Sequence, residues 1–368
     1  MFGHSYFGKK VVITGHTGFK GSWLSIWLNM LGAEIFGIST GPPTRPSMFN
    51  ELGLAEFFVE DHLCDIVEID RLSQTISEIK PDIVFHLAAQ AIVSTGFEQP
   101  LLTLNTNIIG TANIIEAVRQ ANHRCALVLI TSDKAYENVE QVWGYRENDR
   151  LGGKDIYSGS KGAAELIIRS YFETFFASGE SFVSLASARA GNVIGGGDWS
   201  KDRILVDAAK SWSNEKPVTI RNPHATRPWQ HVLEPLSGYL LLGQRLLEKH
   251  ENIRGESFNF GPPAEQVKTV ERLLEDFANA WSSKKMDNYV VQTWEQKFQE
   301  SQLLKLNCDK ALHLLSWEPT LTYQETVALT ANWYSTYYSG SEEMKVFTVE
   351  QIKLYQKLGS QRGRQWTN

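Results

Sequence analysis

The chain has 368 residues, with 36 Lys or Arg against 42 Asp or Glu and a formal net charge of −6. Apolar residues make up 42% and charged residues 21%, the balance of a folded globular protein with one large α/β unit or two closely joined domains. The acidic balance argues against a nucleic-acid-binding surface, while a local basic pocket for a phosphorylated ligand stays open.

Cysteine spacing and hydropathy restrict the cellular setting. Cys64, Cys125 and Cys308 lie far apart and match neither a disulfide framework nor a zinc site, so we expect small buried thiols and no metal. Residues 1–10 lack the apolar run of a signal peptide, and no apolar run is long enough to span a membrane. We therefore expect a cytoplasmic protein that contacts no membrane.

Strands and helices are predicted to alternate along the first half of the chain. A buried strand at 10–14 enters a glycine-rich turn and then a helix that ends at Gly32. Further strands are expected at 33–38, up to 66, 82–87, 126–130 and 183–188, and further helices at 72–79, 106–121 and 157–176. This order predicts an α/β fold, a Rossmann-type doubly wound parallel sheet with helices on both faces.

The second half of the chain is less regular. Glycine, proline and tryptophan cluster at 195–199 and 227–231, whereas a helix at 235–247 and a strand at 257–260 are expected to return to the first domain. We predict these domains: a Rossmann-type domain at 1–190 with returning segments near 232–262, a smaller C-terminal cap at 191–231 and 263–345, and a tail at 346–368. The polar tail either frays or docks through Phe347, Ile352 and Tyr355.

A GxxGxxG motif lies between the first strand and the first helix, over the residues Gly15, His16, Thr17, Gly18, Phe19, Lys20 and Gly21. Glycines permit a tight turn and close approach of the backbone to a pyrophosphate, and the helix N-terminus supplies partial positive charge. The motif predicts a dinucleotide site; the alternative is a tight turn that binds nothing.

The choice between NAD and NADP depends on the end of the second strand. A carboxylate there would favour NAD by binding the ribose hydroxyls, but residues 37–40 contain none. His16, Lys20 and Arg45 would tolerate a 2′-phosphate, or else are solvated loop charges. NADP therefore stays open beside NAD.

Tyr157 and Lys161 are one helical turn apart on the same face of a predicted helix. Because a nearby ammonium favours the phenolate, we expect Lys161 to lower the pKa of Tyr157 and make it a general base for a sugar or alcohol hydroxyl. Such a pair also occurs on solvated helix faces, but the glycine motif favours the functional interpretation.

Taken in order, these motifs resemble the nucleotide-sugar dehydratases of the extended short-chain dehydrogenase/reductase family, and among them the CDP-glucose 4,6-dehydratase subgroup. The resemblance spans nearly the whole chain and is carried by TGHTGFKGSWL, VFHLAAQ, TSDKAYEN, VWGYREND, AGNVIGGGDW, IRNPHATRPWQHVLEPLSGY and FTVEQIKLY. It implies tightly bound, recycled NAD, held by the glycine motif together with Asp65, Ile66, Leu87, Ala88, Ala89, Gln90, Thr106, Tyr157 and Lys161.

The resemblance also implies a lyase reaction, conversion of CDP-glucose to CDP-4-keto-6-deoxyglucose. Tyr157 would take the 4-hydroxyl proton while a hydride passes from carbon 4 to NAD; water is then eliminated across carbons 5 and 6, and the hydride returns to carbon 6. Ser132 would bind the 4-oxygen, and a protonated Asp133 would help the 6-hydroxyl leave. The alternative for Ser132 and Asp133 is a capped turn after a strand.

Lys134 stands where the dTDP-glucose relatives have a glutamate that acts as the base at carbon 5, and the CDP-glucose subgroup has a lysine. With a pKa lowered by burial near Lys161, it would act as that base directly or through a water. Alternatively, Lys134 holds Asp133 or the charge of the enolate.

One loop departs from the subgroup pattern VRxSYxxP. Here Ser94 stands at the arginine position, Gly96 at the serine position and Phe97 at the tyrosine position. Because these changes remove polar contacts beside the sugar, they predict a hexose that lies differently, another substrate or a less active paralogue.

Arginines in the cap are expected to pair with the pyrophosphate of a nucleotide sugar. By the resemblance, the substrate-binding residues are Asn192, Arg203, Arg221, Arg227 and His231. His231 would contact the ligand or bond within its own turn, and Arg189 is either a further ligand or a structural arginine.

Two helices carry more apolar residues than one packed face needs. These are Ile108, Ile114, Ile115 and Val118 on the first, and Ile168, Phe172, Phe175 and Phe176 on the second. The resemblance implies that they form a four-helix contact in a homodimer; the alternative is that they are monomer core.

Other functions remain open. A nucleotide-sugar 4-epimerase would share Tyr157 and Lys161 without needing Asp133 and Lys134. A dehydratase that acts on a different NDP-hexose is a further alternative, because the altered loop changes the contacts to the sugar. A non-catalytic paralogue that binds NAD or a nucleotide sugar belongs to another class.

Overall fold

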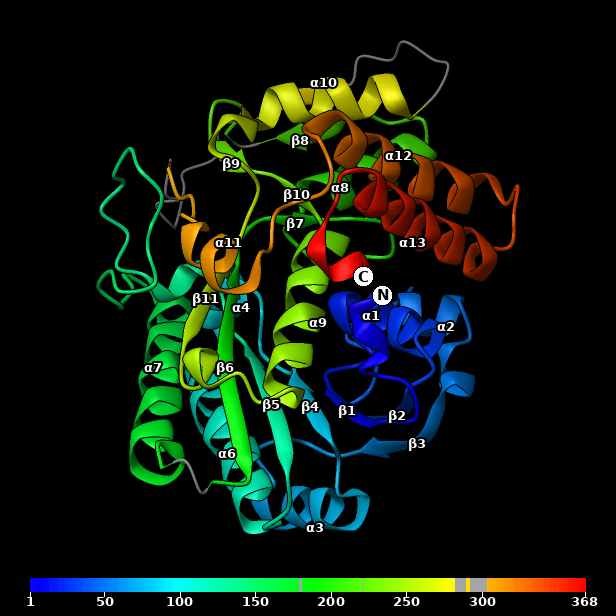
Figure 1. The fold of residues 1–368 in the computed structure, drawn as a ribbon. Coiled ribbons are helices and arrows are strands. Elements are labelled where there is room, and N and C mark those ends of the chain that lie inside the picture. The colour runs from blue at the N-terminus through cyan, green and yellow to red at the C-terminus, as the bar shows by residue number, and fades with distance from the viewer. Residues whose placement is uncertain (179–180, 221, 282–288, 292–302) are drawn as a thin grey trace.

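A seven-stranded sheet forms the centre of the molecule (Figure 1). The structure, a computed structural model, describes residues 1–178, 181–220, 222–281, 289–291 and 303–368. The sheet has the order β11-β6-β5-β4-β1-β2-β3 and every neighbouring pair is parallel. Its strands are β1 Lys10–Thr14, β2 Glu34–Ser39, β3 Phe58–Leu63, β4 Ile83–His86, β5 Cys125–Ile130, β6 Val183–Ala190 and β11 Ser257–Phe260. The predicted doubly wound parallel sheet is confirmed.

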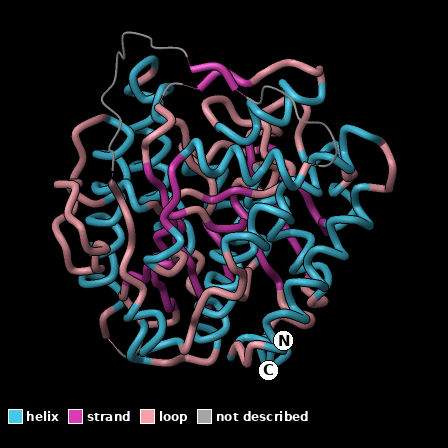
Figure 2. The backbone as a smooth tube through the Cα atoms, turned by 90° about the horizontal axis from the view of Figure 1, so that it is seen from above, coloured by secondary structure: helices cyan, strands magenta, loops and turns pink. Residues whose placement is uncertain are grey.

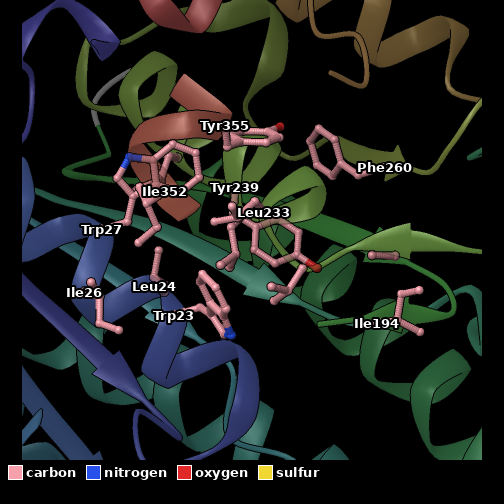
Figure 3. Packing of buried hydrophobic residues seen from close by; sticks show 14 of the residues in the cluster. Trp23, Leu24, Ile26, Trp27, Ile194, Leu233, Tyr239, Phe260, Ile352 and Tyr355 are labelled. Carbon is pink, nitrogen blue, oxygen red and sulfur yellow. The ribbon is translucent and has the colours of Figure 1, made fainter. Parts of the chain in front are cut away.

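Helices cover both faces of this sheet because successive side chains of a strand point to opposite sides. On β1, Val11 and Ile13 pack with α1 (Phe19–Met30) and α9 (Leu233–Leu247). Val12 packs into a second cluster with α3 (Ile69–Ile79), α6 (Gly110–Gln120) and α7 (Ile156–Tyr171). The first cluster is seen from close by in Figure 3, where Trp23, Trp27 and Tyr239 come together.

A smaller assembly lies over the carboxyl ends of the strands, in the upper part of Figure 1. It contains three two-stranded sheets, in which β10 pairs with β7, β12 with β9 and β13 with β8. Its elements are β7 Val193–Ile194, α8 Ile204–Ser213, β8 Val218–Ile220, β9 Thr226–Pro228, β10 Gln230–His231, β12 Val267–Thr269, α10 Val270–Ala280, β13 Tyr289–Val291, α11 Asp309–Leu315 and α12 Tyr323–Ser339. The strand β11, which follows α9, pairs with β6, so this segment returns to the central sheet as the sequence predicted.

Short helical segments connect the main elements. They are α2 Met48–Glu51, α4 Val93–Glu98 and α5 Pro100–Leu104; the π-helical turns η3 Asn105–Ile109 and η5 Phe172–Phe176; and the 3₁₀ turns η1 Phe2–His4, η2 Leu54–Phe57, η4 Asp133–Ala135, η6 Glu251–Ile253, η7 Ala264–Gln266 and η8 Gln365–Thr367. Among the residues described, no helix is both long and apolar enough to cross a membrane.

The C-terminal segment docks instead of fraying. It forms α13 (Met344–Gln361), whose Ile352 and Tyr355 are fully buried (Figure 3). Beyond it, the Trp366 ring stacks on the rings of Tyr355 and Phe2, with centroids 5.2 Å and 5.6 Å apart. The two ends of the chain therefore lie side by side, as Figure 2 shows.

Most of the eight apolar residues singled out on the two helices belong to the core. Buried in the second cluster are Ile114, Ile115, Val118, Ile168 and Phe176. For these five the alternative of monomer core holds, because they fill the space between α6, α7 and the sheet. Phe175, on η5, is the one of the eight that stays exposed, at 48%.

Replacing Trp366 with Ala is expected to lower the free energy of unfolding by about 3–5 kcal/mol, because the lost indole leaves a cavity among packed rings. Urea denaturation followed by circular dichroism measures the change. Trp143→Ala serves as the control, since the Trp143 side chain is 66% exposed and its removal should cost within about 0.5 kcal/mol. Equal costs for the two variants would contradict the docked arrangement.

Candidate active site

The glycine motif makes a turn that a Cβ atom would not fit. Gly15 has a φ of +73°, and a Cβ there would lie 2.8 Å from the Ala88 backbone. At Gly21 an added Cβ would lie 2.3 Å from the Gly15 carbonyl oxygen. Gly18 precedes α1 and has no side chain to cap its first amides, which stay available for an anion. A pyrophosphate fits this cradle.

The alanine-rich segment at residues 87–90 lies beside this turn because β4 pairs with β1. The Leu87 and Ala88 amides donate to Thr14 at the end of β1, at 3.1 Å and 3.2 Å. The Gln90 amide donates to Asn107 Oδ1 at 2.9 Å, which brings η3 and its half-buried Thr106 to the same edge. This edge, between β1 and β4, is where the strand order reverses, the usual dinucleotide crevice of such sheets.

Asp65 and Ile66 lie beyond the end of β3 and close the far side of the crevice. Asp65 is half-buried and accepts a hydrogen bond from the Val67 amide at 3.1 Å. Ile66 is buried against Gly110, where an added Cβ would lie 2.4 Å from its side chain. Both residues are therefore placed by the β3–α3 turn and by the start of α6.

His16 and Lys20 point in different directions. The His16 ring is fully buried, crosses β2 over Gly37 and places Nε2 3.0 Å from Asp61 Oδ1 on β3. Burial lowers the pKa of His16, while Asp61 acts in the opposite direction. Lys20 extends to Tyr239 on α9, with Nζ 3.4 Å from the phenol oxygen. His16 and Lys20 therefore lie apart, and the tolerance of a 2′-phosphate by His16, Lys20 and Arg45 stays a prediction.

Ser132 and Asp133 follow β5 at the same edge of the sheet. Ser132 caps the η4 turn by accepting from the Lys134 amide at 3.2 Å, and its hydroxyl donates to Asp133 Oδ1 at 2.9 Å. Asp133 is 4% exposed and rests against Gly191, where an added Cβ would lie 2.4 Å from Oδ2. The hydroxyl of Ser132 therefore both caps the turn and holds the Asp133 carboxylate in place. The half-buried Lys134 lies on the same turn.

Tyr157 and Lys161 are buried on the first turns of α7, which Asp155 caps by accepting from the Ser158 amide at 2.9 Å. Burial raises the pKa of Tyr157, while a hydrogen bond with Ser132 and the charge of Arg203 lower it. The expected lowering below the ordinary phenol value is wrong, because removal of the phenol from water outweighs these contributions. Burial also lowers the pKa of Lys161 to about 8, with Glu165 acting against it.

Charged groups from several elements meet at this cluster. Burial lowers the pKa of Lys20 to about 8, and the charges of Arg203 and Asp133 act on it next. Arg203 precedes α8, with Nε 3.8 Å from Asp198 Oδ2. Arg203 lowers the pKa of both Tyr157 and Lys20, although the three residues lie far apart in sequence, so only the fold brings these groups together.

The other expected substrate residues lie in the smaller assembly. Asn192 is half-buried between β6 and β7, and Arg227 is half-buried on β9, with Nη1 donating to the Thr226 carbonyl at 2.8 Å. His231 is fully buried, and its Nδ1 accepts from the Leu233 amide at 3.3 Å, so it bonds within its own turn. Burial lowers the pKa of His231 to about 3. Arg221 falls outside the described residues.

The altered loop forms α4, which lies against Tyr157 at one side of the cluster. Gly96 packs on Tyr157, where an added Cβ would lie 3.3 Å from the tyrosine Cβ. The Ser94 hydroxyl donates to Asp202 Oδ2 at 2.7 Å, and Glu98 pairs with Lys201 Nζ at 3.1 Å. These contacts connect α4 to the segment that carries Arg203.

Sequence reasoning missed Asp61 and Tyr239. Asp61 is a carboxylate beside β2 that stands on β3, outside residues 37–40, and strand pairing sets its position opposite Gly37. Tyr239 lies in the apolar run of α9, where nothing local distinguishes it from core. Within the described ranges, no group of three or more His, Cys, Asp or Glu is placed to hold a metal ion.

Comparisons with known proteins agree with this geometry. A family model described as GDP-mannose 4,6 dehydratase matches residues 12–330. A curated CDP-glucose 4,6-dehydratase of Salmonella typhimurium is 45% identical over 351 residues, which cover 95% of this chain and 96% of that protein.

Solved structures of similar fold include two nucleotide-sugar enzymes. A dTDP-glucose 4,6-dehydratase from Streptomyces venezuelae with NAD and TYD bound has a TM-score of 0.74 at 18% identity, covering 91% of this chain and 100% of that one. A UDP-glucuronic acid 4-epimerase from Bacillus cereus, in complex with UDP-glucuronic acid and NAD, has a TM-score of 0.75 at 21% identity, covering 89% and 100%. At these identities, the two structures support the fold alone.

Replacing Gly21 with Ala is expected to weaken dinucleotide binding about tenfold or more, because an overlap with the Gly15 carbonyl costs about 1–3 kcal/mol. Calorimetric titration with NAD measures the affinity. Gly159→Ala is the matched control, since an added Cβ on that helical residue meets nothing within 4 Å. Unchanged affinity in the folded Gly21→Ala variant would argue against a pyrophosphate at this turn.

Proposed function

The chain belongs to the GDP-mannose 4,6-dehydratase family of extended short-chain dehydrogenases/reductases, and on this premise we propose that it is an NAD-dependent hydro-lyase that converts CDP-glucose to CDP-4-keto-6-deoxyglucose. One observation carries the proposal: the Ser132 hydroxyl bonds Asp133 and interacts with Tyr157 in a buried cluster beyond β5. The 45% identity to a CDP-glucose 4,6-dehydratase supports the choice of substrate.

The glycine turn fits NAD, since Gly15 and Gly21 leave the space that a pyrophosphate against the backbone requires. When bound, NAD supplies the acceptor for the hydride of carbon 4 and later the donor to carbon 6. The Asp61 carboxylate near the end of β2 favours NAD over NADP, because it would repel a 2′-phosphate. Asn192, Arg203 and Arg227 are proposed to hold the nucleotide sugar from the cap.

Tyr157 would accept the proton of the sugar 4-hydroxyl, with Ser132 bound to the same oxygen. Burial raises the pKa of Tyr157, so the loss of its proton depends on the groups that stabilise its phenolate. These are the Ser132 hydroxyl and the Arg203 guanidinium. The Lys161 ammonium, one helical turn on, supplies a further positive charge on the same helix.

Asp133 and Lys134 would carry out the elimination that follows. The new keto group acidifies the proton on carbon 5, and Lys134 takes this proton directly or through a water, or else stabilises the enolate. Asp133 would act as the acid for the 6-hydroxyl, which leaves as water. Carbon 5 would regain a proton from the same base while carbon 6 accepts the hydride that bound NAD would supply.

A dehydratase that acts on another NDP-hexose is the second candidate, and α4 is the observation that favours it. Ser94 and Glu98 are engaged with Asp202 and Lys201, and Gly96 lies directly on Tyr157. This wall differs from the VRxSYxxP pattern and would shape the hexose pocket differently. A 4-epimerase or a non-catalytic paralogue is less favoured, because neither needs a buried Asp133 held by Ser132.

Incubation with NAD and CDP-glucose tests the proposal, with product mass and the alkaline absorbance of a 4-keto-6-deoxy sugar as readouts. Loss of one water from CDP-glucose supports it. Loss of water from dTDP-, GDP- or UDP-hexoses alone keeps the chemistry and changes the substrate. Absence of turnover on all four, with NAD still bound, would favour the non-catalytic alternative.

Tyr157→Phe is expected to lower kcat by about 10²–10⁴-fold, because the variant lacks the group that exchanges the 4-hydroxyl proton. Calorimetry should show NAD affinity close to that of the original protein. Tyr171→Phe, further along the same helix, should leave kcat unchanged and controls for general effects of the substitution. Normal turnover by Tyr157→Phe would remove this residue from the role of base.

We also propose a homodimer, formed by α5, η3, α7 and η5. These neighbouring elements carry five exposed apolar side chains: Leu101 at 72%, Leu102 at 47%, Ile109 at 49%, Leu166 at 55% and Phe175 at 48%. An exposed apolar set of this kind marks an interface between proteins.

Leu166→Lys is expected to shift the protein toward monomer, because a charge at the centre of an apolar interface stays unpaired. Analytical ultracentrifugation at several concentrations measures the association. Leu312→Lys, at an equally apolar but separate position that is 48% exposed on α11, is the control and should not alter the mass. A dimer unaffected by Leu166→Lys would place the interface elsewhere.

A further inference from the structure

A buried ion pair connects the central sheet to the helix of Tyr157. Arg189 on β6 donates from Nε to Glu165 Oε1 at 2.9 Å and from Nη2 to Oε2 at 2.8 Å. Their side chains are 3% and 2% exposed. Two charges removed from water are stable only if further hydrogen bonds satisfy their remaining donors and acceptors. For Arg189 and Glu165, these hydrogen bonds include ones with Tyr136 and Thr131.

Glu165 binds the first residue of the segment that holds Ser132 and Asp133. The Thr131 hydroxyl donates to Glu165 Oε1 in a short hydrogen bond. On the other side, the Ser187 hydroxyl donates to Oε2 at 2.9 Å. One carboxylate thus joins the end of β5 to β6.

Arg189 binds the last residue of the same segment. Its Nη1 donates to the Tyr136 hydroxyl at 2.7 Å, and its guanidinium lies 4.9 Å from the centroid of the Tyr136 ring. The Tyr136 hydroxyl in turn donates to Asn259 Oδ1 at 2.8 Å. The two members of the ion pair therefore hold the two ends of residues 131–136.

The ion pair also lies next to the second half of the site. Glu165 follows Lys161 by one turn of α7 and Tyr157 by two, so all three share one face of the helix. The buried Glu165 carboxylate therefore connects the segment that contains η4, through Thr131, with the face of α7 that carries Tyr157 and Lys161.

We propose that the Arg189–Glu165 pair positions residues 131–136, through Thr131 and Tyr136, so that Asp133 and Lys134 meet the sugar during elimination. This inference rests on the proposed dehydratase function. Both side chains are almost fully buried and bond to protein groups, so we assign both as positioning residues. Without the two end contacts, η4 keeps its Ser132 cap but loses its fixed orientation toward α7.

Thr131→Val tests the first contact, since it removes the hydroxyl and keeps the shape of the side chain. We expect kcat for CDP-glucose to fall about tenfold or more, because a small misplacement of reacting groups costs up to about 10²-fold, with KM and NAD affinity little changed. Thr131→Ser keeps the hydroxyl and should restore kcat. Ser187→Ala, which removes a bond to the same carboxylate from the sheet side, should keep kcat within about twofold. Equal losses in Thr131→Val and Ser187→Ala would overturn the proposal in favour of a general core role.

Tyr136→Phe tests the second contact by a spectroscopic signature. Elimination depends on Asp133 and Lys134, both on η4, whereas the earlier oxidation depends on Tyr157 on α7 and on Ser132, which precedes η4. A displaced η4 should therefore slow the elimination more than the oxidation. Stopped-flow mixing with CDP-glucose is expected to show enzyme-bound NADH, by its near-ultraviolet absorbance, building up and decaying slowly. Loss of kcat without this accumulation would contradict the assignment.

Amide hydrogen exchange decides the inference independently of turnover. The peptide that contains residues 131–136 should exchange faster in Thr131→Val and in Tyr136→Phe than in the original protein, and unchanged in Ser187→Ala. Unaltered exchange in the first two variants would overturn the proposal. A protein inactive on every nucleotide sugar would refute the proposed function, while this measurement would still decide whether the ion pair orders the segment.

Discussion

Both faces of the central sheet must be kept from water, and the other features of the molecule follow from this constraint. Val11 and Ile13 on one side of β1 and Val12 on the other are fully buried, so helices are needed on both sides. Strands joined by such helices run in parallel, and their carboxyl ends meet at one edge. The glycine turn, the alanine-rich segment and the Ser132–Asp133 turn all follow strands at that edge, which is why residues distant in sequence form one cluster.

Local patterns predicted much of this arrangement, and the failures have a common cause. The buried strands, the helix after the glycine turn and the 157–161 spacing are encoded within a few neighbouring residues. The position of His16 is not, since it depends on Gly37 leaving room for the ring and on Asp61 standing opposite in β3. The pKa of Tyr157 likewise depends on how deeply α7 is buried, and the outer faces of α6 and α7 depend on their mutual packing.

Charges of both signs meet in the cluster around Lys20. Burial lowers the pKa of both Lys20 and Lys161 to about 8, so their ammonium groups are held in an environment that disfavours charge. Arg203 and Lys161 also lower the pKa of Lys20, whereas Asp133 and Asp198 raise it. An anionic ligand such as the proposed nucleotide sugar would pair with these ammonium groups and raise their pKa.

The packing of Trp27 has a consequence for biosynthesis. Its ring is enclosed by Phe2 on one side and by Tyr355 and Trp366 on the other, residues at opposite ends of the sequence. On the ribosome, α1 and Phe2 emerge early, but Trp27 lacks Tyr355 and Trp366 until residue 366 has left the exit tunnel. The helix that begins at the glycine turn is therefore covered last on this side, and its uncovered apolar side chains are surface of the kind that makes a nascent chain prone to aggregation.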